Sequence, residues 1–311
     1  MREVRWERMF PDQLEAAFAE CPVLYLAYGL CEPHGPQNAI GLDALKAHAL
    51  CVRAAEQAGG IVAPPDYWHI HEVGTYATWA RRAVGEVTRK WLTAMPPWQH
   101  FKNVCYHVRA ADMLGVHAVI LLTGHYGPNW KDLKTLVELL QPRVAARLYA
   151  LPDFEANEPG FDRDHRSSGD HAGKVETSLL WSLEPACVDL TRLPPFPLPP
   201  QAEGEPGRHF AMGHNANLSN RRTGDRMVAD EVAFLTRKAA DLRAAYPAAA
   251  KPDSAARLNR FEDVETFWET TVRPVLGKFE SYAPYHQPTA VVQELPADSV
   301  WKANATGPLR T

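Results

Sequence analysis

The chain has 311 residues, of which 46% are hydrophobic and 23% charged, a composition typical of a globular protein that buries a sizeable core. Its formal net charge of -4 provides no broad attraction for a nucleic-acid backbone or an anionic membrane, so we expect neither as a partner. The five cysteines lack C-x-x-C spacing, residues 1–8 lack a signal-peptide centre, and no apolar run is long enough to span a membrane, so the sequence predicts a cytoplasmic protein with reduced thiols.

Helix-like and strand-like segments alternate through the first two thirds of the chain. The apolar spacing predicts helices at 11–20, 43–58, 98–114, 130–140 and 175–183, and strands at 23–28, 61–63, 116–122 and 147–151. This alternation predicts an α/β protein with three layers, α/β/α, and a central, mostly parallel sheet. In such folds, ligands bind beyond the carboxyl ends of the strands.

Two further regions have a distinct composition. The loop after Pro64-Pro65 holds histidines and aromatic residues from 67 to 79 and is predicted to be too polar for the core. Prolines are concentrated in residues 194–200 and predict a rigid connector or lid.

Beyond residue 200 we expect a polar stretch at 208–224, a helix at 230–246, a linker at 247–253 and a helix broken near Pro274 at 261–279. Residues 1–246 are therefore interpreted as one domain and 247–311 as a C-terminal helical and irregular extension.

The stretch directly after the first strand carries three candidate metal ligands. Glu32 and His34 are two residues apart, so in an extended segment their side chains leave the same face, and Pro33 stiffens the spacer. Asp43 stands where a helix begins. An aspartate in that position is also a common helix cap, so a metal site and a simple cap are both open at this point.

Two more constellations follow later in the chain. His125 emerges from the end of the strongest strand, between Gly124 and Tyr126, at the edge where sites form in parallel sheets. His171 and Glu176 are five residues apart, about 140° around a continuous helix, so both can face one site only if His171 precedes the helix. The alternative is that Asp170 caps the helix and Glu176 is solvated.

Taken together, these motifs resemble the creatininase (creatinine amidohydrolase) family from about residue 21 to residue 183. The family pattern is Gly-x-x-Glu-x-His-Gly-Pro, an Asp eleven residues after the Glu, a strand ending in a Gly-His motif, and His-Ala-Gly-x-x-Glu-Thr-Ser. The resemblance implies a parallel sheet between helices, a dinuclear zinc, manganese or iron site, and a homohexamer. It implies that His171 contacts the substrate or moves a proton, and that Asp43 bridges the metals. The ligands that it implies are Glu32, His34, Asp43, His125 and Glu176.

The chain also departs from the family. Gln37-Asn38-Ala39 replaces the usual His-Leu-Pro, and Gly127 stands where creatinine-cleaving members carry a glutamate after His-Tyr. Glu176 must then complete the ligand set. The tryptophans that those members place before the second histidine motif are absent, so creatinine is a poor candidate substrate. The residues expected to contact the substrate are Tyr126, Trp79 and Phe161.

Mixed carboxylate and imidazole ligands suit divalent zinc, manganese or iron, two of which activate a bridging water. We therefore predict a metal-dependent amidohydrolase that cleaves a non-peptide C–N bond of a small molecule, such as a cyclic amide or formamide. Two alternatives stay open. One is a metal-dependent lactonase, isomerase or dehydratase acting on a cyclic or polyol substrate. The other is a non-catalytic metal-bound scaffold.

Overall fold

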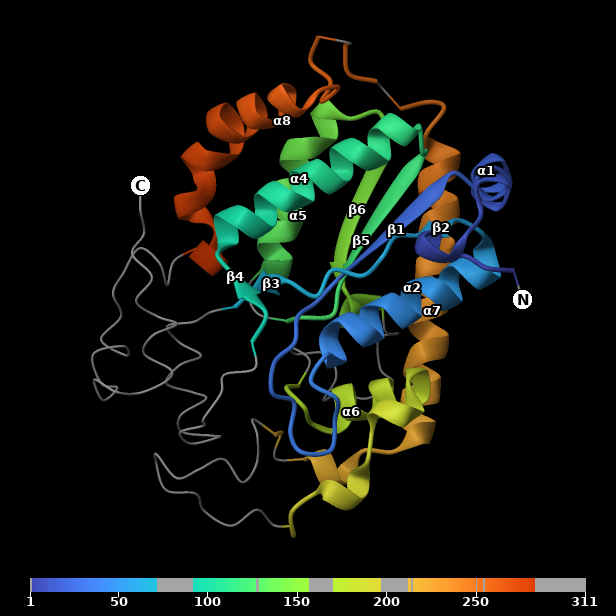
Figure 1. Cartoon of the computed structure of the whole chain (residues 1–311), viewed down its shortest axis with the longest axis vertical. Helices are drawn as coiled ribbons and strands as arrows, with labels where there is room; N and C mark the ends of the chain where they lie inside the picture. Colours follow the sequence, from blue (N-terminus) through green and yellow to red (C-terminus); the bar gives the residue numbers. More distant parts are fainter. Residues whose placement is uncertain are drawn as a thin grey trace.

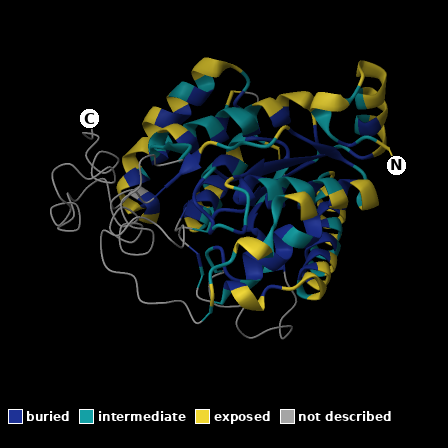
Figure 2. Ribbon diagram, turned by 60° about the horizontal axis from the view of Figure 1, so that its bottom comes forward, coloured by how far each residue is buried: buried dark blue, intermediate teal, exposed yellow. Residues whose placement is uncertain are grey.

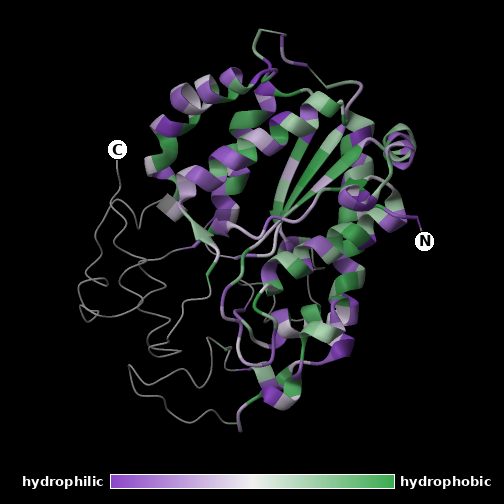
Figure 3. Ribbon diagram, in the orientation of Figure 1, coloured by the Kyte–Doolittle hydropathy of each residue, from purple (hydrophilic) through white to green (hydrophobic). Residues whose placement is uncertain are grey.

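A four-stranded parallel sheet lies at the centre of the structure, in the order β2-β1-β5-β6 (Figure 1). The computed structural model describes residues 2–71, 92–126, 129–156, 170–196, 212–213, 215–249, 251–253 and 255–282. Trp79, Phe161 and residues 197–200 of the proline-rich segment lie outside these ranges. The strands are β1 (Val23–Tyr28), β2 (Ile61–Val62), β5 (Ala118–Thr123) and β6 (Arg147–Pro152). Every residue of β1 and β5 is buried, and the strands are largely apolar in Figure 3, as expected when helices cover both faces.

The order of the strands creates a crevice between β1 and β5. The chain passes from β1 to β2 on one side and later places β5 on the other side of β1. Connections that leave two adjacent parallel strands in opposite directions open a crevice at their carboxyl ends. Tyr28 pairs with Thr123, so β1 and β5 end at the same level. The residues that follow both strands therefore meet at this point.

Helices cover the sheet on both faces, which confirms the predicted three-layer fold. Leu24 and Leu26 share a core with α4 (Pro97–Leu114) and α5 (Asn129–Leu140). Tyr25 and Ala27, on the opposite face, pack with α2 (Leu42–Ala58), α6 (Lys174–Leu183) and α7 (Arg221–Ala245). Figure 2 shows the buried strands between helices whose outer faces are exposed. Helix α1 (Pro11–Glu20) coincides with its predicted range.

Helix α7 starts at Arg221, so the prediction that it begins at residue 230 is wrong by nine residues, and the polar stretch at 208–224 ends within the helix. Asn220 caps the helix, since its side-chain oxygen accepts a hydrogen bond from Thr223 N at 2.9 Å. Gly224 lies inside the helix, where a Cβ would overlap the carbonyl oxygen of Ser178 in α6. This glycine therefore permits close packing of two helices instead of ending one.

The segment after Pro64-Pro65 is partly buried, so the prediction that it is too polar for the core is wrong for residues 69–71. His69, Ile70 and His71 are each at most 1% exposed. Strand β3 (His69–Ile70) pairs in parallel with β4 (Ala94–Met95), and the ring centroids of His69 and His100 lie 4.0 Å apart. Pairing and ring packing together allow these imidazoles to be buried.

The described part of the C-terminal region packs on the sheet domain. Helix α8 (Phe261–Phe267) continues as a π-helical turn to Val272 and a 3-10 turn that contains Pro274, so the predicted break is present. Buried apolar residues from this region join the core that contains α4 and α5; they are Leu258, Val264, Phe267, Trp268, Val272, Leu276 and Phe279. Asp132 of α5 accepts a hydrogen bond from Ser281 N at 2.7 Å.

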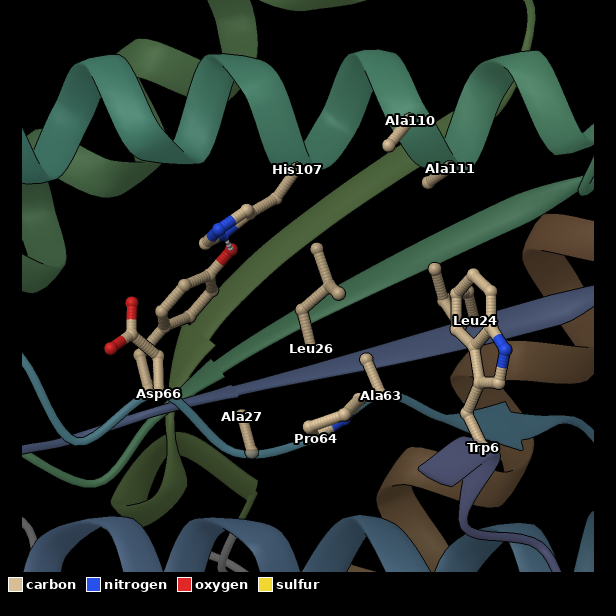
Figure 4. Close-up of a pocket in the computed structure, with 11 residues that line it drawn as sticks. Trp6, Leu24, Leu26, Ala27, Ala63, Pro64, Asp66, His107, Ala110 and Ala111 are labelled. Carbon is tan, nitrogen blue, oxygen red and sulfur yellow. Dashed lines mark hydrogen bonds between the residues drawn. The ribbon is translucent and has the colours of Figure 1, made fainter. Parts of the chain in front are cut away.

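A cavity of about 290 Å³ lies between α4, β1 and the segment around Pro64 (Figure 4). Its wall is mostly apolar, and its polar groups include Asp66 and the pair formed by Tyr28 OH and His107 Nδ1, 3.2 Å apart. None of the candidate site residues lines it. Among the helices that the structure describes, none has the length and apolar character needed to cross a membrane.

Two glycines bring the first turn of α2 against the strand ends. Gly29 follows β1 and Gly124 follows β5. A Cβ on Gly29 would overlap Ala44 N, and a Cβ on Gly124 would overlap the Asp43 carbonyl oxygen. Backbone contact of this kind is possible only where the side chain is a hydrogen atom. It places the Asp43 side chain over the crevice between β1 and β5.

Gly124→Ala should lower the free energy of unfolding by about 3 kcal/mol, at the upper end of the usual cost of overpacking, because the new methyl group overlaps the α2 backbone. Urea unfolding measures this change. Gly41→Ala is the matched control, since a Cβ there would meet only side-chain atoms, the nearest at 3.2 Å on Tyr67. Equal losses in the two variants would contradict the close-approach explanation.

Candidate metal centre

The structure brings all five predicted ligands together at the carboxyl end of the sheet. Glu32 and His34 come from the loop after β1, Asp43 from the first turn of α2, His125 from the end of β5, and Glu176 from the first turn of α6. Four of them are 1% exposed, and His125 is 6% exposed. Elements far apart in sequence therefore converge on one buried polar cluster.

The described residues form three groups of three possible ligands: two share Asp43, and the third consists of Glu32, His34 and His171. His125 Nδ1 lies 3.1 Å from Glu32 Oε1 and 3.1 Å from Asp43 Oδ2. His34 Nε2 lies 3.2 Å from Asp43 Oδ1 and 3.7 Å from Glu176 Oε2. In each group the candidate ligand atoms are within 4.8 Å of one another. Asp43 thus turns one oxygen to each of the two groups that share it.

Several atoms in this cluster contact only other candidate ligands. Glu32 Oε1 and His34 Nε2 are buried and make no well-aligned hydrogen bond among the residues that the structure describes, and their near neighbours are His125 Nδ1 and Asp43 Oδ1. Buried polar atoms without partners are costly and are normally satisfied. Carboxylates and imidazoles are common ligands of divalent zinc, manganese and iron. The cluster therefore has the residue types that such a cation requires as ligands, and it has ligand atoms available to bind one.

The acidic groups control the protonation of the histidines. Burial alone would lower the pKa of His34, but the carboxylates of Asp43, Glu32 and Glu176 raise it to about 9. The same balance of burial against Glu32 and Asp43 raises the pKa of His125 well above its ordinary value. Without a metal, both imidazoles therefore carry protons at neutral pH and take the place of a cation among the carboxylates.

His171 belongs to the third possible group, with Glu32 and His34, and it is held in one orientation. Its ring stacks on His34 with centroids 4.5 Å apart, its Nε2–H donates to Pro33 O at 2.9 Å, and its Nδ1 lies 3.9 Å from Glu32 Oε1. Burial, followed by the nearby His34, lowers the pKa of His171. The imidazole is therefore neutral and directs Nδ1 towards the candidate ligands.

The loop that carries His171 has a strained backbone. Ala172 has φ of 50°, which is uncommon for a residue with a side chain. Its N–H donates to Glu176 Oε2 at 2.8 Å, and its carbonyl oxygen accepts from Gln37 Nε2 at 3.0 Å. The surrounding hydrogen bonds hold this conformation, as strained residues at functional sites require.

The capping interpretation of Asp170 is also correct in part. Its two oxygens accept the backbone N–H groups of Val175 and Glu176 at 2.8 and 2.9 Å, while Gly173 is the residue before the helix. Glu176 is 1% exposed, so the alternative of a solvated glutamate is wrong. One aspartate thus fixes the start of α6 and with it the position of Glu176.

The departures from the family pattern at residues 37 and 38 connect the ligand loop to α6. Gln37 Nε2 donates to Thr177 Oγ1 at 3.2 Å, and Asn38 Nδ2 donates to the same hydroxyl at 2.9 Å. Asn38 Nδ2 also donates to His34 O at 3.0 Å. These two amides therefore form a wall that positions His34.

Three buried residues at the site were missed in the sequence. His71 Nε2–H donates to Glu32 Oε2 at 2.9 Å. Lys46 Nζ lies 2.6 Å from Glu176 Oε1 and 3.3 Å from Asp153 Oδ2. The signal for Lys46 was its position three residues after Asp43, on the same face of α2. His71 and Asp153 gave no such signal, because their neighbours come from distant parts of the chain.

Tyr126, predicted to contact the substrate, makes contacts within the protein. The Lys46 ammonium lies 3.8 Å from the centre of its ring, and its ring meets that of Phe154 edge to face at 5.1 Å. Its assignment to substrate binding stays a prediction. All five cysteines are free thiols, as predicted.

Comparison with known proteins decides the family. The model of the family Creatininase, described as creatinine amidohydrolase, matches residues 7–257. The chain belongs to the creatininase family. It is therefore a hydrolase of the metal-dependent amidohydrolase type. A creatinine amidohydrolase of Pseudomonas putida is 26% identical, and the match covers 72% of this chain and 87% of that protein.

Solved creatininase structures share the fold. A crystal structure of creatinine amidohydrolase is 22% identical, with a TM-score of 0.59, over 78% of this chain and 98% of that chain. The structure named Creatininase Mn is 22% identical, with a TM-score of 0.57, over 79% and 99% of the two chains. A creatininase mutant described as the Zn-Zn type is 23% identical, with a TM-score of 0.59, over 79% and 100%.

Metal affinity should rise with pH between 6.5 and about 9, because a metal binds only the neutral imidazole and must displace the proton from His34, whose pKa is raised to about 9. The same shift stabilises the metal-free fold fully below the unfolded pKa of about 6.5, and this stabilisation is lost as pH rises through the folded value. Calorimetric titration with Mn²⁺ at a pH of about 7.5, in two buffers of different ionisation enthalpy, should detect proton release. Binding that is independent of pH and releases no protons would contradict this account.

Proposed function

We propose that this protein hydrolyses a non-peptide C–N bond of a small molecule, such as a cyclic amide or a formamide, with two divalent ions of zinc, manganese or iron in each subunit. The observation that carries the proposal is Asp43, whose two oxygens face two separate ligand groups. Glu32 and His125 would hold one ion, and His34 and Glu176 the other. A carboxylate shared in this way is the usual bridge of a two-metal hydrolase.

The protein residues supply binding, orientation and proton transfer. When bound, the two ions would supply an activated water and polarise the scissile carbonyl group. His71 holds one oxygen of Glu32 and so leaves the other oxygen directed to the site. The stacked rings of His34 and His171 keep both imidazoles in fixed planes. This order allows a small substrate to react without reorganisation of the protein.

His171 is the residue proposed to transfer the proton. Since its Nε2–H is donated to Pro33 O, the lone pair is on Nδ1, which faces Glu32. This nitrogen accepts a proton as the water attacks and delivers it to the departing nitrogen atom. A neutral imidazole with a lowered pKa is in the correct state to begin that sequence.

Substrate choice is proposed from the differences between this chain and the creatinine-cleaving members that it resembles. Gly127 follows His125-Tyr126 where those members carry a glutamate, and their tryptophans are absent between residues 152 and 170. The proposed substrate is therefore a small amide other than creatinine. The homohexamer and the substrate contacts of Trp79 and Phe161 stay predictions of the same family resemblance.

Turnover assays test the proposed function. The metal-loaded protein should release an amine or ammonia from at least one member of a panel of cyclic amides and formamides, and chelation should abolish the activity. Hydrolysis of lactones alone would replace the proposal with lactonase activity. A metal-loaded protein that acts on no member of either panel would favour the non-catalytic scaffold and contradict the proposal.

Asp43→Ala should lose both metal ions, because this side chain contributes to both ligand groups. Metal analysis of protein purified without chelators measures the number of ions per chain. Asp12→Ala is the matched control, since Asp12 is also an acidic residue in the first turn of a helix but is exposed. Two ions retained in Asp43→Ala would exclude the bridging role.

His171→Ala should keep about two ions per chain while turnover falls by roughly 10²-fold or more, the usual loss when a general acid is removed. His117→Ala is the control, because His117 stacks on Tyr246 in a different region. A role limited to supporting the α6 helix predicts unchanged turnover per folded molecule. That result, or the loss of an ion in His171→Ala, would contradict proton transfer by His171.

A further inference from the structure

Lys46 is a fully buried lysine beside the candidate metal ligands. Its side chain is 0% exposed and is enclosed by three groups from different parts of the chain. Asp153, after β6, lies 3.3 Å from Nζ, Glu176 of α6 lies 2.6 Å away, and the Tyr126 ring centre lies 3.8 Å away. Lysines are almost never fully buried unless they are paired. Burying this charge costs desolvation energy, which its two carboxylate partners must offset.

The contacts of Glu176 differ between its two carboxylate oxygens. Oε1 accepts the short hydrogen bond from Lys46. Oε2 accepts the N–H of Ala172 at 2.8 Å and is the oxygen that faces His34 Nε2, at 3.7 Å. A carboxylate with both oxygens directed to one cation occupies two coordination positions. In this structure Oε1 is instead bound to Lys46.

We propose that Lys46 is a positioning residue that restricts Glu176 to a single-oxygen ligand and so keeps a coordination position open for the substrate. The inference rests on the proposed two-metal function. Lys46 lies about one helical turn after Asp43 on α2. The same helix therefore carries Asp43, the ligand shared by the two metal ions, and Lys46, which would restrict Glu176. His71 makes an equivalent contact with Glu32, since it donates a hydrogen bond to one of the two carboxylate oxygens.

The alternative is that Lys46 only neutralises Asp153, and a double variant separates the two roles. Lys46→Met combined with Asp153→Asn removes one positive and one negative charge, so the net charge of the cluster is unchanged. The side-chain amide introduced by Asp153→Asn keeps an oxygen for the N–H of Phe154, which Asp153 Oδ1 accepts at 2.7 Å. The double variant therefore removes the hydrogen bond from Lys46 to Glu176. It also removes the carboxylate at position 153, which would otherwise be buried without a counter-charge. Lys131→Met, at an exposed lysine paired with Glu280, controls for the loss of a lysine.

The probe is Co²⁺, titrated into metal-free protein and followed by calorimetry and visible absorption. In the double variant, both oxygens of Glu176 would be free to bind a cation, so we still expect two Co²⁺ ions per chain. The ion that binds more weakly in the wild-type protein should bind about tenfold more tightly in the variant, which corresponds to about 1.4 kcal/mol. The visible absorption should be weaker, because a higher coordination number lowers the intensity of Co²⁺ bands. Amidase turnover, once a substrate is found, should fall about tenfold or more with little change in KM.

Unchanged Co²⁺ affinity and spectrum in the double variant would overturn the proposal and leave Lys46 with a neutralising role only. Weaker binding of the second ion would also overturn it, because Lys46 would then orient Glu176 for the metal instead of restricting it. If the wild-type protein binds fewer than two Co²⁺ ions, the proposed function itself fails, and the inference fails with it. The wild-type titration thus distinguishes the two failures.

Discussion

The backbone contact between the first turn of α2 and the ends of β1 and β5 is the constraint on which the site depends. Gly29 and Gly124 allow this contact, since a Cβ on either would overlap the α2 backbone. The contact places Asp43 over the crevice at the point where the strand order reverses. From there its two oxygens reach His34 and His125, which belong to different strand ends. A central carboxylate shared by two groups of ligands follows directly from the topology.

A cluster of buried acids needs compensation, and the structure provides it from several elements. Glu32, Asp43 and Glu176 are each 1% exposed, which is costly without paired charges or hydrogen bonds. His71 and Lys46 each donate to one oxygen of a carboxylate. The remaining negative charge raises the pKa of the histidines that face it. The same field that protonates these imidazoles in the metal-free protein attracts divalent cations.

Local signals in the sequence were sufficient for the sheet, its covering helices and the five candidate ligands, because strand periodicity and short motifs depend on neighbouring residues. They were insufficient where the deciding contact comes from a distant element. The helix predicted from residue 230 in fact begins at Arg221, and Gly224 lies inside it in contact with Ser178 of α6. His71 and Lys46 acquire their roles from Glu32 and Glu176, which lie 39 and 130 residues away. Pairings of that range are set by the topology and leave no local pattern, so only the spacing of Lys46 from Asp43 along α2 indicated that it lies near the site.

Electron paramagnetic resonance of the protein loaded with Mn²⁺ tests the central claim most directly, namely that Asp43 is shared between two metal ions. Two ions bridged by one carboxylate are a few ångströms apart and magnetically coupled, so the account predicts the spectrum of a coupled manganese pair once two equivalents are bound. Mn²⁺ free in the same buffer provides the uncoupled reference. A wild-type spectrum of isolated ions at two equivalents, or saturation at one equivalent, would contradict the account.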